Sequence, residues 1–147
     1  MNIKTFLSPS DVVLDLKARD KMAVLEELSS RAAAVLNVPA EVIALEIERR
    51  EELGSTGIGG GVSMPHARFR EVKKPFGLLA RLKQPVNFEA IDGQPVDLVF
   101  LLLLPASSQL DQLNTLAAVA RKLRDPKVLH DLRVASTAGE LYKAVAA

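Results

Sequence analysis

Val96-Asp-Leu-Val-Phe-Leu-Leu-Leu-Leu-Pro105 is the segment that decides the fold. Its apolar run from Leu98 to Leu104 is seven residues long, far short of the roughly 20 that a membrane-spanning helix needs. A short apolar run bounded by a breaker such as Pro105 is typical of a fully buried strand. We therefore expect residues 96–104 to form the central strand of a sheet.

Strand and helix signals alternate on both sides of this segment. We expect strands at residues 12–16 and 76–83, extended chain at 62–66, and helices at the following places: 21–36, 39–53, from Ser107 or Ser108 to about 124, a short one from Pro126, and a last one after Thr137. Asp20 is expected to cap the helix at 21–36, and Thr137-Ala-Gly-Glu140 matches a capping box. The interleaving predicts an α/β fold with helices on both faces of the sheet. Since no linker or repeat interrupts it, residues 1–147 are expected to be a single domain.

Helical spacing also predicts which side chains face the core. In the first helix these are Met22, Leu25, Leu28, Ala32, Val35 and Leu36. In the helix that ends near Arg124 they are Leu110, Leu113, Leu116, Ala117, Ala120 and Leu123.

Composition excludes several classes of protein. The net charge is +1 and aromatic residues are only 4% of the chain, so we expect no nucleic-acid partner. The absence of cysteine excludes thiolate chemistry and disulfides. The two histidines lie 64 positions apart, so we predict no metal site. The first residues do not resemble a signal peptide, and we expect a cytoplasmic protein without membrane insertion.

The segment Gly54-Ser-Thr-Gly-Ile-Gly-Gly-Gly-Val-Ser-Met-Pro-His-Ala-Arg68 contains five of the eight glycines and one of the two histidines. It lacks the spacing of a dinucleotide fingerprint and the lysine of a P-loop. A neutral imidazole, here His66 held by Pro65, is a competent nucleophile. Glycine-rich backbone can bind an anion through its amides. The segment predicts phosphoryl or acyl-like transfer, although a loop histidine without chemistry is the alternative.

Arginines near this segment could bind a transferred phosphoryl group. Arg50 lies one turn before Gly54, and Arg49 and Arg68 are competing candidates. We expect the rest of the acidic and basic cluster at 48–52 to be a solvated helix end. His130 is expected to be a surface or structural residue.

The stretch Arg50-Glu-Glu-Leu-Gly-Ser-Thr-Gly-Ile-Gly-Gly-Gly-Val-Ser-Met-Pro-His-Ala67 resembles the active-site segment of the fructose/mannitol-type enzyme IIA domains. These domains belong to the bacterial phosphoenolpyruvate-dependent phosphotransferase system. Within that family, the chain most resembles the stand-alone nitrogen-regulatory enzyme IIA proteins. The resemblance covers essentially the whole chain, and its other carriers are Leu7–Val13, Ile91–Phe100, Leu129–Arg133 and Glu140–Tyr142.

The resemblance implies a mixed β-sheet flanked by helices. It implies that His66 accepts a phosphoryl group through Nε2 from an HPr-like histidine phosphocarrier, and that Arg50 rather than Arg49 balances its charge. We expect the amides of Gly57, Gly59, Gly60 and Gly61 to bind the phosphoryl oxygens. Family partners are an enzyme IIB in sugar transport, or regulatory targets such as potassium transporters and sensor kinases. No cofactor is implied.

The sequence departs from the family pattern at one site position. Family members commonly carry a second histidine, in a His-Leu pair, beside the first; the matching residues here are Gln112 and Leu113. A glutamine amide can donate one hydrogen bond to a phosphoryl oxygen, but it cannot become a cation. The expected effect is a changed rate of transfer or lifetime of the phosphorylated form.

Three functions are therefore compatible with the sequence. The first is a regulatory phosphocarrier whose phosphorylation state controls its partner proteins. The second is a sugar-transport enzyme IIA that passes the phosphoryl group to a separate enzyme IIB. The third is an interaction module that is no longer phosphorylated, in which Gln112 marks the lost chemistry.

Overall fold

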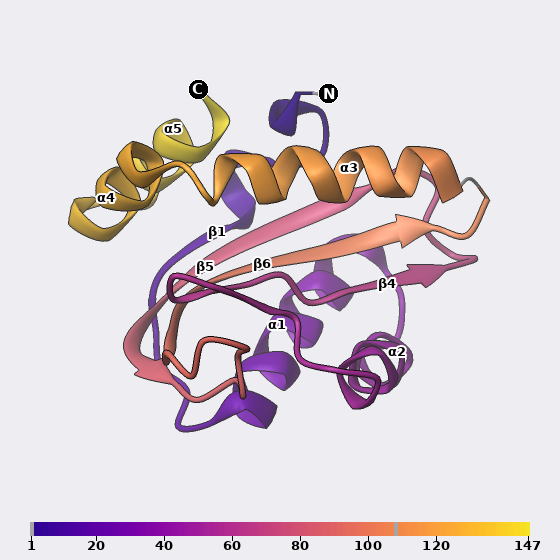
Figure 1. Ribbon diagram of the computed structural model, residues 1–147. Helices are drawn as coiled ribbons and strands as arrows, with labels where there is room; N and C mark the ends of the chain where they lie inside the picture. The colour runs from indigo at the N-terminus through magenta and orange to yellow at the C-terminus, as the bar shows by residue number, and fades with distance from the viewer. Residues whose placement is uncertain (1, 108) are drawn as a thin grey trace.

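The computed structural model describes residues 2–107 and 109–147, which form one mixed sheet between two layers of helices (Figure 1). In these residues the strands are β1 (Val12–Leu16), β2 (Gly57–Gly59), β3 (Val62–Ser63), β4 (His66–Phe69), β5 (Phe76–Val86) and β6 (Val96–Pro105). The α-helices are α1 (Lys21–Leu36), α2 (Ala40–Glu52), α3 (Gln109–Lys122), α4 (Pro126–Val134) and α5 (Ala138–Ala146). Two short 3₁₀ helices, Ile3–Thr5 and Pro9–Asp11, precede β1.

The predicted central strand is confirmed. β6 pairs with β5 in the antiparallel direction on one side, and with β3 and β4 in the parallel direction on the other. β1 extends the sheet beyond β5, and β2 extends it beyond β3. Parallel and antiparallel pairs thus coexist, as the resemblance to enzyme IIA domains implied.

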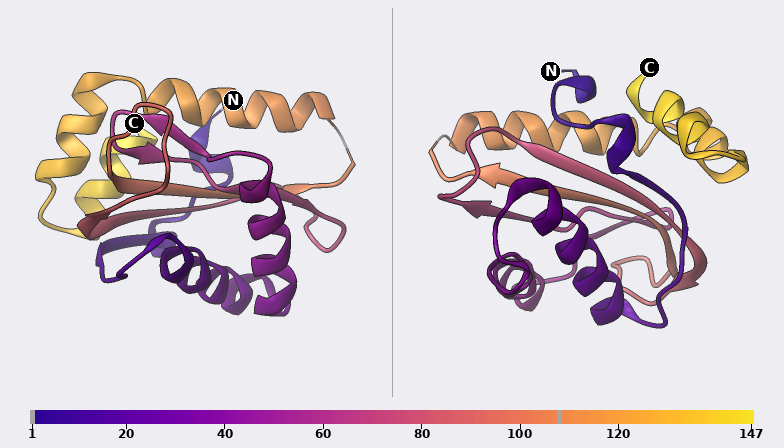
Figure 2. Two further views of the ribbon diagram at one scale, coloured as in Figure 1. Left: turned by 60° about the horizontal axis from the view of Figure 1, so that its bottom comes forward. Right: turned by 180° about the vertical axis from the view of Figure 1, so that it is seen from behind.

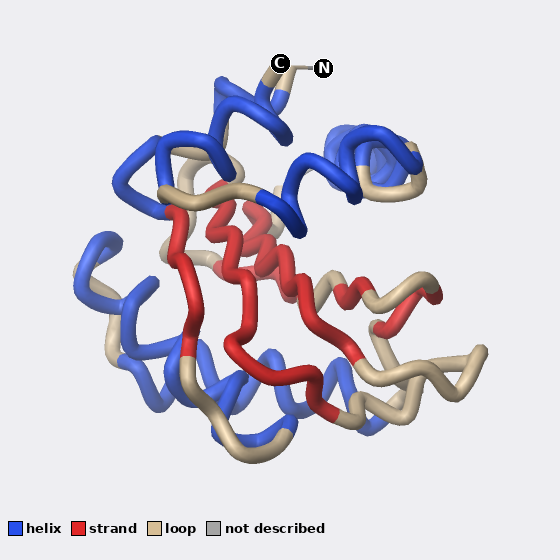
Figure 3. Tube along the Cα trace, turned by 90° about the vertical axis from the view of Figure 1, so that its left-hand side faces the viewer, coloured by secondary structure: helices blue, strands red, loops and turns tan. Residues whose placement is uncertain are grey.

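Both faces of β6 are buried because its apolar side chains alternate between two cores. Leu98, Phe100 and Leu102 pack under α3, α4 and α5, whereas Val99 and Leu101 pack under α1 and α2. Figures 2 and 3 show these two helical layers with the sheet between them. An apolar strand of this kind requires cover on both sides, which is the physical reason for the three-layer arrangement.

β3 and β4 lie one after the other along the same edge of β6. Val62 pairs with Leu98 and His66 pairs with Leu102. Pro65 interrupts the ladder because it has no N–H, but its carbonyl oxygen still accepts a bond of 2.9 Å from the Leu102 N–H. The extended segment expected at residues 62–66 is therefore two short strands, and His66 is the first residue of the second one.

The helix caps confirm two sequence signals. The Asp20 side chain accepts a hydrogen bond of 2.8 Å from the Ala23 amide at the start of α1. Thr137 Oγ1 accepts one of 3.1 Å from the Glu140 amide at the start of α5. The second bond of the capping box differs from expectation, since the Glu140 carboxylate accepts from the Ser136 amide rather than from that of Thr137.

Strand ends and helix faces were predicted less well. β5 continues past Lys83 to Val86, since Pro85 lies where the pairing with β6 shifts and no ladder bond is needed from it. In α1, Met22 and Val35 are exposed rather than buried. The expected start of α3 at Ser108 lies outside the described residues.

The predicted core face of α3 was wrong at Leu110, Leu113 and Ala117, all of which are exposed. Leu110 and Leu113 are 68% and 63% exposed, whereas Gln112 and Thr115 face the sheet. The two polar side chains are tolerated there because both are hydrogen-bonded: Gln112 to the Pro105 carbonyl and Thr115 to the Asp111 carbonyl. The prediction failed because Leu110 and Leu113 recur at the spacing of a buried helix face, whereas that side of α3 faces solvent.

Within residues 2–107 and 109–147, no helix combines the length and the apolar character that crossing a membrane requires.

Ser29 in α1 supplies a test of the packing under the sheet. It is 1% exposed, and its Oγ is the one buried side-chain oxygen or nitrogen of the described residues without a hydrogen-bond partner. Ser29→Ala should raise the free energy of unfolding by about 1 kcal/mol, because it removes an unpaired buried hydroxyl and improves helix propensity. Urea denaturation measures the change. The neighbouring exposed Ser30 gives the control, since Ser30→Ala changes propensity alone; a loss of stability in Ser29→Ala would contradict the prediction.

Candidate functional site

A cleft of about 480 Å³ opens between the C-terminal end of α2, strand β4 and the first turns of α3. Figure 1 shows β4 at the right of the sheet, with the start of α3 above it and α2 below it. The cleft brings His66, Arg50 and Gln112 together from separate parts of the sequence. Its other described lining residues are Glu46, Arg49, Leu53, Ala67, Arg68, Leu104, Leu113 and Leu116.

The His66 ring is oriented by one backbone contact. Its Nδ1 lies 2.8 Å from the carbonyl oxygen of Met64. A carbonyl oxygen can only accept a hydrogen bond, so Nδ1 carries the proton and donates it. The lone pair of the neutral ring is therefore on Nε2, which is the nucleophilic nitrogen.

The surroundings of His66 favour the neutral ring. Burial lowers the pKa of His66 most, and the positive charge of Arg50 lowers it further. The bond to the Met64 carbonyl and the negative charge of Glu51 act in the opposite direction but do not cancel the shift. With a pKa below the usual 6.5, His66 is uncharged at pH 7 and its Nε2 is available.

The arginines of the cleft differ in their partners. Arg50 donates a hydrogen bond of 2.8 Å from one terminal nitrogen to the Gly54 carbonyl, which leaves the other donors of its guanidinium for a ligand. Arg49 is held 2.9 Å from Glu46. Arg68 lies two residues after His66 on β4 and therefore on the same face of that strand. Of the three, Arg50 is the one whose charge acts on the His66 ring.

Gln112 is held at the wall of the cleft. Its Nε2 donates a hydrogen bond of 2.7 Å to the Pro105 carbonyl, and the residue is 8% exposed. That bond uses one of the two hydrogens of the side-chain amide, so the other remains for a ligand. The other histidine of the chain, His130, is an exposed residue of α4, which contributes no described residue to the cleft.

The glycine turn is not brought to His66. Gly59, Gly60 and Gly61 have positive φ angles of 95°, 67° and 80° and form the turn from the last residue of β2 to β3. Their position along β6 is next to Leu98, whereas His66 pairs with Leu102. Four residues of strand separate these points by about 13 Å.

Two backbone amides of the glycine-rich segment, those of Gly57 and Gly60, already bind groups of the chain itself. The Gly60 N–H donates 3.0 Å to Asp92 Oδ2, and the Gly57 N–H donates 3.0 Å to Ser55 Oγ. The bond from Gly60, with a second from the Gln94 amide, lowers the pKa of the Asp92 carboxyl. The anion that this backbone binds is thus the carboxylate of Asp92.

Close packing explains why two of these residues are glycines. A β-carbon on Gly57 would lie 2.7 Å from that of Ala90, and one on Gly61 would lie 2.6 Å from the Arg133 guanidinium. Arg133 bonds to both the Gly60 carbonyl and Asp97, which fastens the turn to the sheet.

A buried polar cluster behind His66 was not foreseen. Glu51 was expected on a solvated helix end, but its side chain is 7% exposed and lies 2.6 Å from the Lys21 ammonium. The same carboxylate accepts hydrogen bonds from the amide and the hydroxyl of Thr56, and the Thr56 hydroxyl contacts Ser63 Oγ at 3.0 Å. No local sequence pattern reveals this cluster, because its members come from α1, α2, β3 and the segment between α2 and β2.

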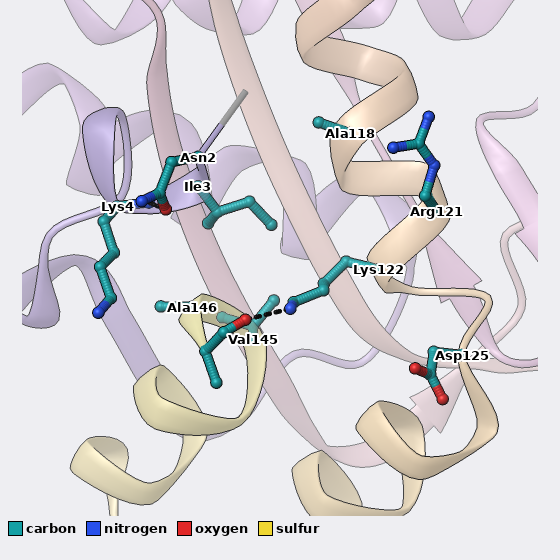
Figure 4. A pocket seen from close by; sticks show the side chains of 10 residues that line it. Asn2, Ile3, Lys4, Ala118, Arg121, Lys122, Asp125, Val145 and Ala146 are labelled. Carbon is teal, nitrogen blue, oxygen red and sulfur yellow. Dashed lines mark hydrogen bonds between the residues drawn. The ribbon is translucent and has the colours of Figure 1, made fainter.

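A second cavity, of about 590 Å³, lies between the N-terminal segment, the end of α3 and α5 (Figure 4). Lys4, Arg121 and Lys122 lie around it, and the Lys122 ammonium bonds to the Ala147 carbonyl. Its described lining contains no histidine or hydroxyl nucleophile. The His66 cleft is therefore the better candidate for covalent chemistry.

Known proteins match this chain in sequence. Residues 5–147 match the family model described as "Phosphoenolpyruvate-dependent sugar phosphotransferase system, EIIA 2". The chain is 40% identical over 146 residues to a nitrogen regulatory protein of Bradyrhizobium diazoefficiens, which covers 99% of this chain and 95% of the relative. It is 41% identical over 128 residues to that of Escherichia coli, covering 86% and 78%.

Solved structures give the same result. The crystal structure of nitrogen regulatory protein IIA-Ntr from Neisseria meningitidis superposes with a TM-score of 0.92 at 33% identity, over 97% of this chain and 98% of that one. The mannitol IIA of E. coli shares the fold, with a TM-score of 0.80 at 18% identity over 95% and 98% of the two chains. A match over nearly the whole chain, in sequence and in fold, shows that the protein belongs to the EIIA 2 family of the phosphotransferase system and is like the nitrogen regulatory IIA-Ntr proteins within it.

Proposed function

We propose that this protein is a regulatory phosphocarrier that accepts a phosphoryl group on His66 Nε2 from the phosphohistidine of an HPr-type donor. The observation that carries the proposal is the bond from His66 Nδ1 to the Met64 carbonyl. It leaves Nε2 unprotonated on a neutral ring in a cleft that Arg50 also lines. Membership of the EIIA 2 family supports the class of donor.

The transfer needs no proton to leave His66. The Nε2 lone pair forms the new N–P bond while the N–P bond of the donor breaks, and the electron pair of that bond returns to the donor's ring. His66 keeps its Nδ1–H, so its ring becomes cationic and donates a stronger, charge-assisted bond to Met64. Arg50 and the free amide hydrogen of Gln112 offer donors to the phosphoryl oxygens.

The glycine turn takes no part in this proposal, because the Gly60 amide is already bonded to Asp92. The binding of the phosphoryl group then depends more on the arginines than on backbone amides. Since Gln112 stays neutral, the site has fewer positive charges than one with a second histidine.

Exposed leucines around the cleft supply a docking surface for the donor. Leu53, Leu110 and Leu113 are 85%, 68% and 63% exposed, and Leu53 and Leu113 line the cleft. Exposed apolar side chains grouped around a reactive group are typical of a protein-binding surface. A mannitol IIA of this fold forms a complex with phosphorylated enzyme IIB, which supports the docking of a phosphorylated protein here.

The regulatory role rests on the relatives. Nitrogen regulatory proteins match at 40% and 41% identity, whereas a mannosyl-glycerate EIIABC component matches at 30%. The phosphoryl group carries about −1.5 to −2 charges, which the cationic ring of His66 offsets only in part. The added negative charge would repel an acidic partner surface and would be costly to desolvate against an apolar one. The partners are regulatory targets such as a potassium transporter or a sensor kinase. An enzyme IIB of sugar transport is the alternative.

Phosphorylation of His66 is tested with phosphoenolpyruvate, enzyme I and HPr or its nitrogen-branch counterpart. Intact-mass spectrometry should detect one acid-labile phosphoryl group on the wild type and none on His66→Ala. Gln112→His serves as a comparison, because it restores the family's second histidine. No phosphorylation of the wild type together with phosphorylation of Gln112→His would instead favour the interaction module without transfer.

The charge of Arg50 predicts a pH effect at His66. Because burial and Arg50 lower the pKa of His66, its ring should titrate below 6.5 in the unphosphorylated protein. Arg50→Gln removes a positive charge and should raise that pKa, so that protonation begins at higher pH. An NMR titration of the ring measures both values. Arg49→Gln is the matched control, and equal shifts in the two variants would refute a specific effect of Arg50.

The docking surface predicts a kinetic effect of Leu113. Leu113→Ala should raise the KM for the phosphorylated donor about tenfold and leave kcat nearly unchanged, because it removes apolar contact area without touching His66. Val134→Ala is the control, since Val134 is similarly exposed, at 59%, on α4. Equal KM values for the two variants would mean that the donor docks on another surface of the protein.

A further inference from the structure

We infer that the ion pair between Lys21 and the buried carboxylate of Glu51, acting through Thr56, positions His66 by fixing the carbonyl group that binds its Nδ1–H. Lys21, Glu51 and Thr56 are then positioning residues, since none of them touches the reacting Nε2. The kinetic consequence rests on the proposed role of His66 as phosphoryl acceptor, whereas the structural consequence at the ring does not.

The first step of the argument is that Met64 is held at both ends of its backbone. Its N–H donates a hydrogen bond of 3.0 Å to the Thr56 carbonyl. Its own carbonyl accepts the 2.8 Å bond from His66 Nδ1. The orientation of the imidazole therefore depends on the position of Thr56, ten residues earlier in the chain.

The second step is that Thr56 is held by a single carboxylate. Its amide lies 3.3 Å from Glu51 Oε2, and its hydroxyl donates to Glu51 Oε1. The hydroxyl has one hydrogen, so at the 3.0 Å contact with Ser63 the Ser63 hydroxyl is the donor. Thr56 is 4% exposed and Ser63 is fully buried, so water does not compete for these bonds.

The third step is that Lys21 holds Glu51. The Lys21 ammonium lies 2.6 Å from Glu51 Oε2, 3.5 Å from the Phe88 carbonyl and 5.6 Å from the centre of the Phe88 ring. The Ser55 hydroxyl donates to that same Phe88 carbonyl at 2.6 Å. The ammonium thus connects the start of α1, the end of α2 and the segment before β6 at one point behind the cleft.

The cost of this arrangement argues against a role in packing alone. A carboxylate in the last turn of α2 faces the negative end of the helix dipole, which is unfavourable. Burying the Glu51 carboxylate and most of the Lys21 side chain adds a desolvation penalty that apolar side chains of similar volume would avoid. Apolar residues could not provide two acceptor oxygens, one for the Thr56 amide and one for the Thr56 hydroxyl.

The test compares Thr56→Val with Thr56→Ser in the full chain. Valine keeps the shape but loses the hydroxyl, whereas serine keeps the hydroxyl. ¹⁵N NMR of the His66 ring should show the Nδ1–H tautomer in the wild type and in Thr56→Ser. In Thr56→Val the ratio of Nε2–H to Nδ1–H tautomer should rise about fivefold, as expected when the bond to Met64 is weakened. An unchanged ratio in a folded Thr56→Val protein would overturn the inference.

The second comparison uses the carboxylate itself. Glu51→Gln keeps one acceptor oxygen but removes the charge, and Glu27→Gln removes an exposed carboxylate of α1 that pairs with Arg31. Glu51→Gln should lower the rate constant of phosphoryl acceptance about tenfold with the KM for the donor unchanged, because the ring is misplaced and the docking surface is intact. Glu27→Gln should behave as the wild type. A Glu51→Gln protein with the wild-type rate constant would contradict a positioning role.

The two readouts separate this inference from the proposed function. If the wild type is never phosphorylated, the phosphocarrier proposal fails, but the tautomer ratio in Thr56→Val still decides whether Thr56 orients the ring. If the wild type is phosphorylated and the tautomer ratio does not respond to Thr56→Val, the positioning inference fails alone.

Discussion

Burial of β6 on both faces is the constraint on which the rest of the structure depends. A strand with apolar side chains pointing in both directions has to be paired along both edges and covered on both faces. β5 satisfies one edge, and β3 with β4 satisfies the other. The pairing of His66 with Leu102 follows from that edge, so the position of the His66 ring is set by the same strand that organises the core.

The cleft forms beside this strand, where α2 ends and where β4 and α3 begin. α2 brings Arg50 to it, β4 brings His66, and α3 brings Gln112. Polar side chains face the sheet in the first turns of α3, while its leucines face outward. The helix thereby leaves apolar side chains around a polar cleft, which is the combination on which the proposed docking of a phosphorylated donor depends.

Much of the fold could be predicted from local signals. The buried strand, the caps at Asp20 and Thr137 and the alternation of strands and helices depend on neighbouring residues, and local energetics decide them. Helix faces were less predictable: Leu110 and Leu113 have core-like spacing but are exposed. Spacing shows that an apolar side exists, but not whether the sheet or a partner covers it.

The sequence by itself determined the architecture and the family, and it singled out His66 as the candidate acceptor. It could do so because an apolar run and an unbroken motif are properties of consecutive residues. Tertiary structure alone decided which groups surround that histidine. Gly60 lies near His66 in sequence, yet its amide binds Asp92 at the other end of β6. Lys21 is distant in sequence, yet it holds Glu51 behind the ring. Contacts of this kind depend on where separate elements meet in space, and that is decided by how the sheet pairs and how the helices pack on it.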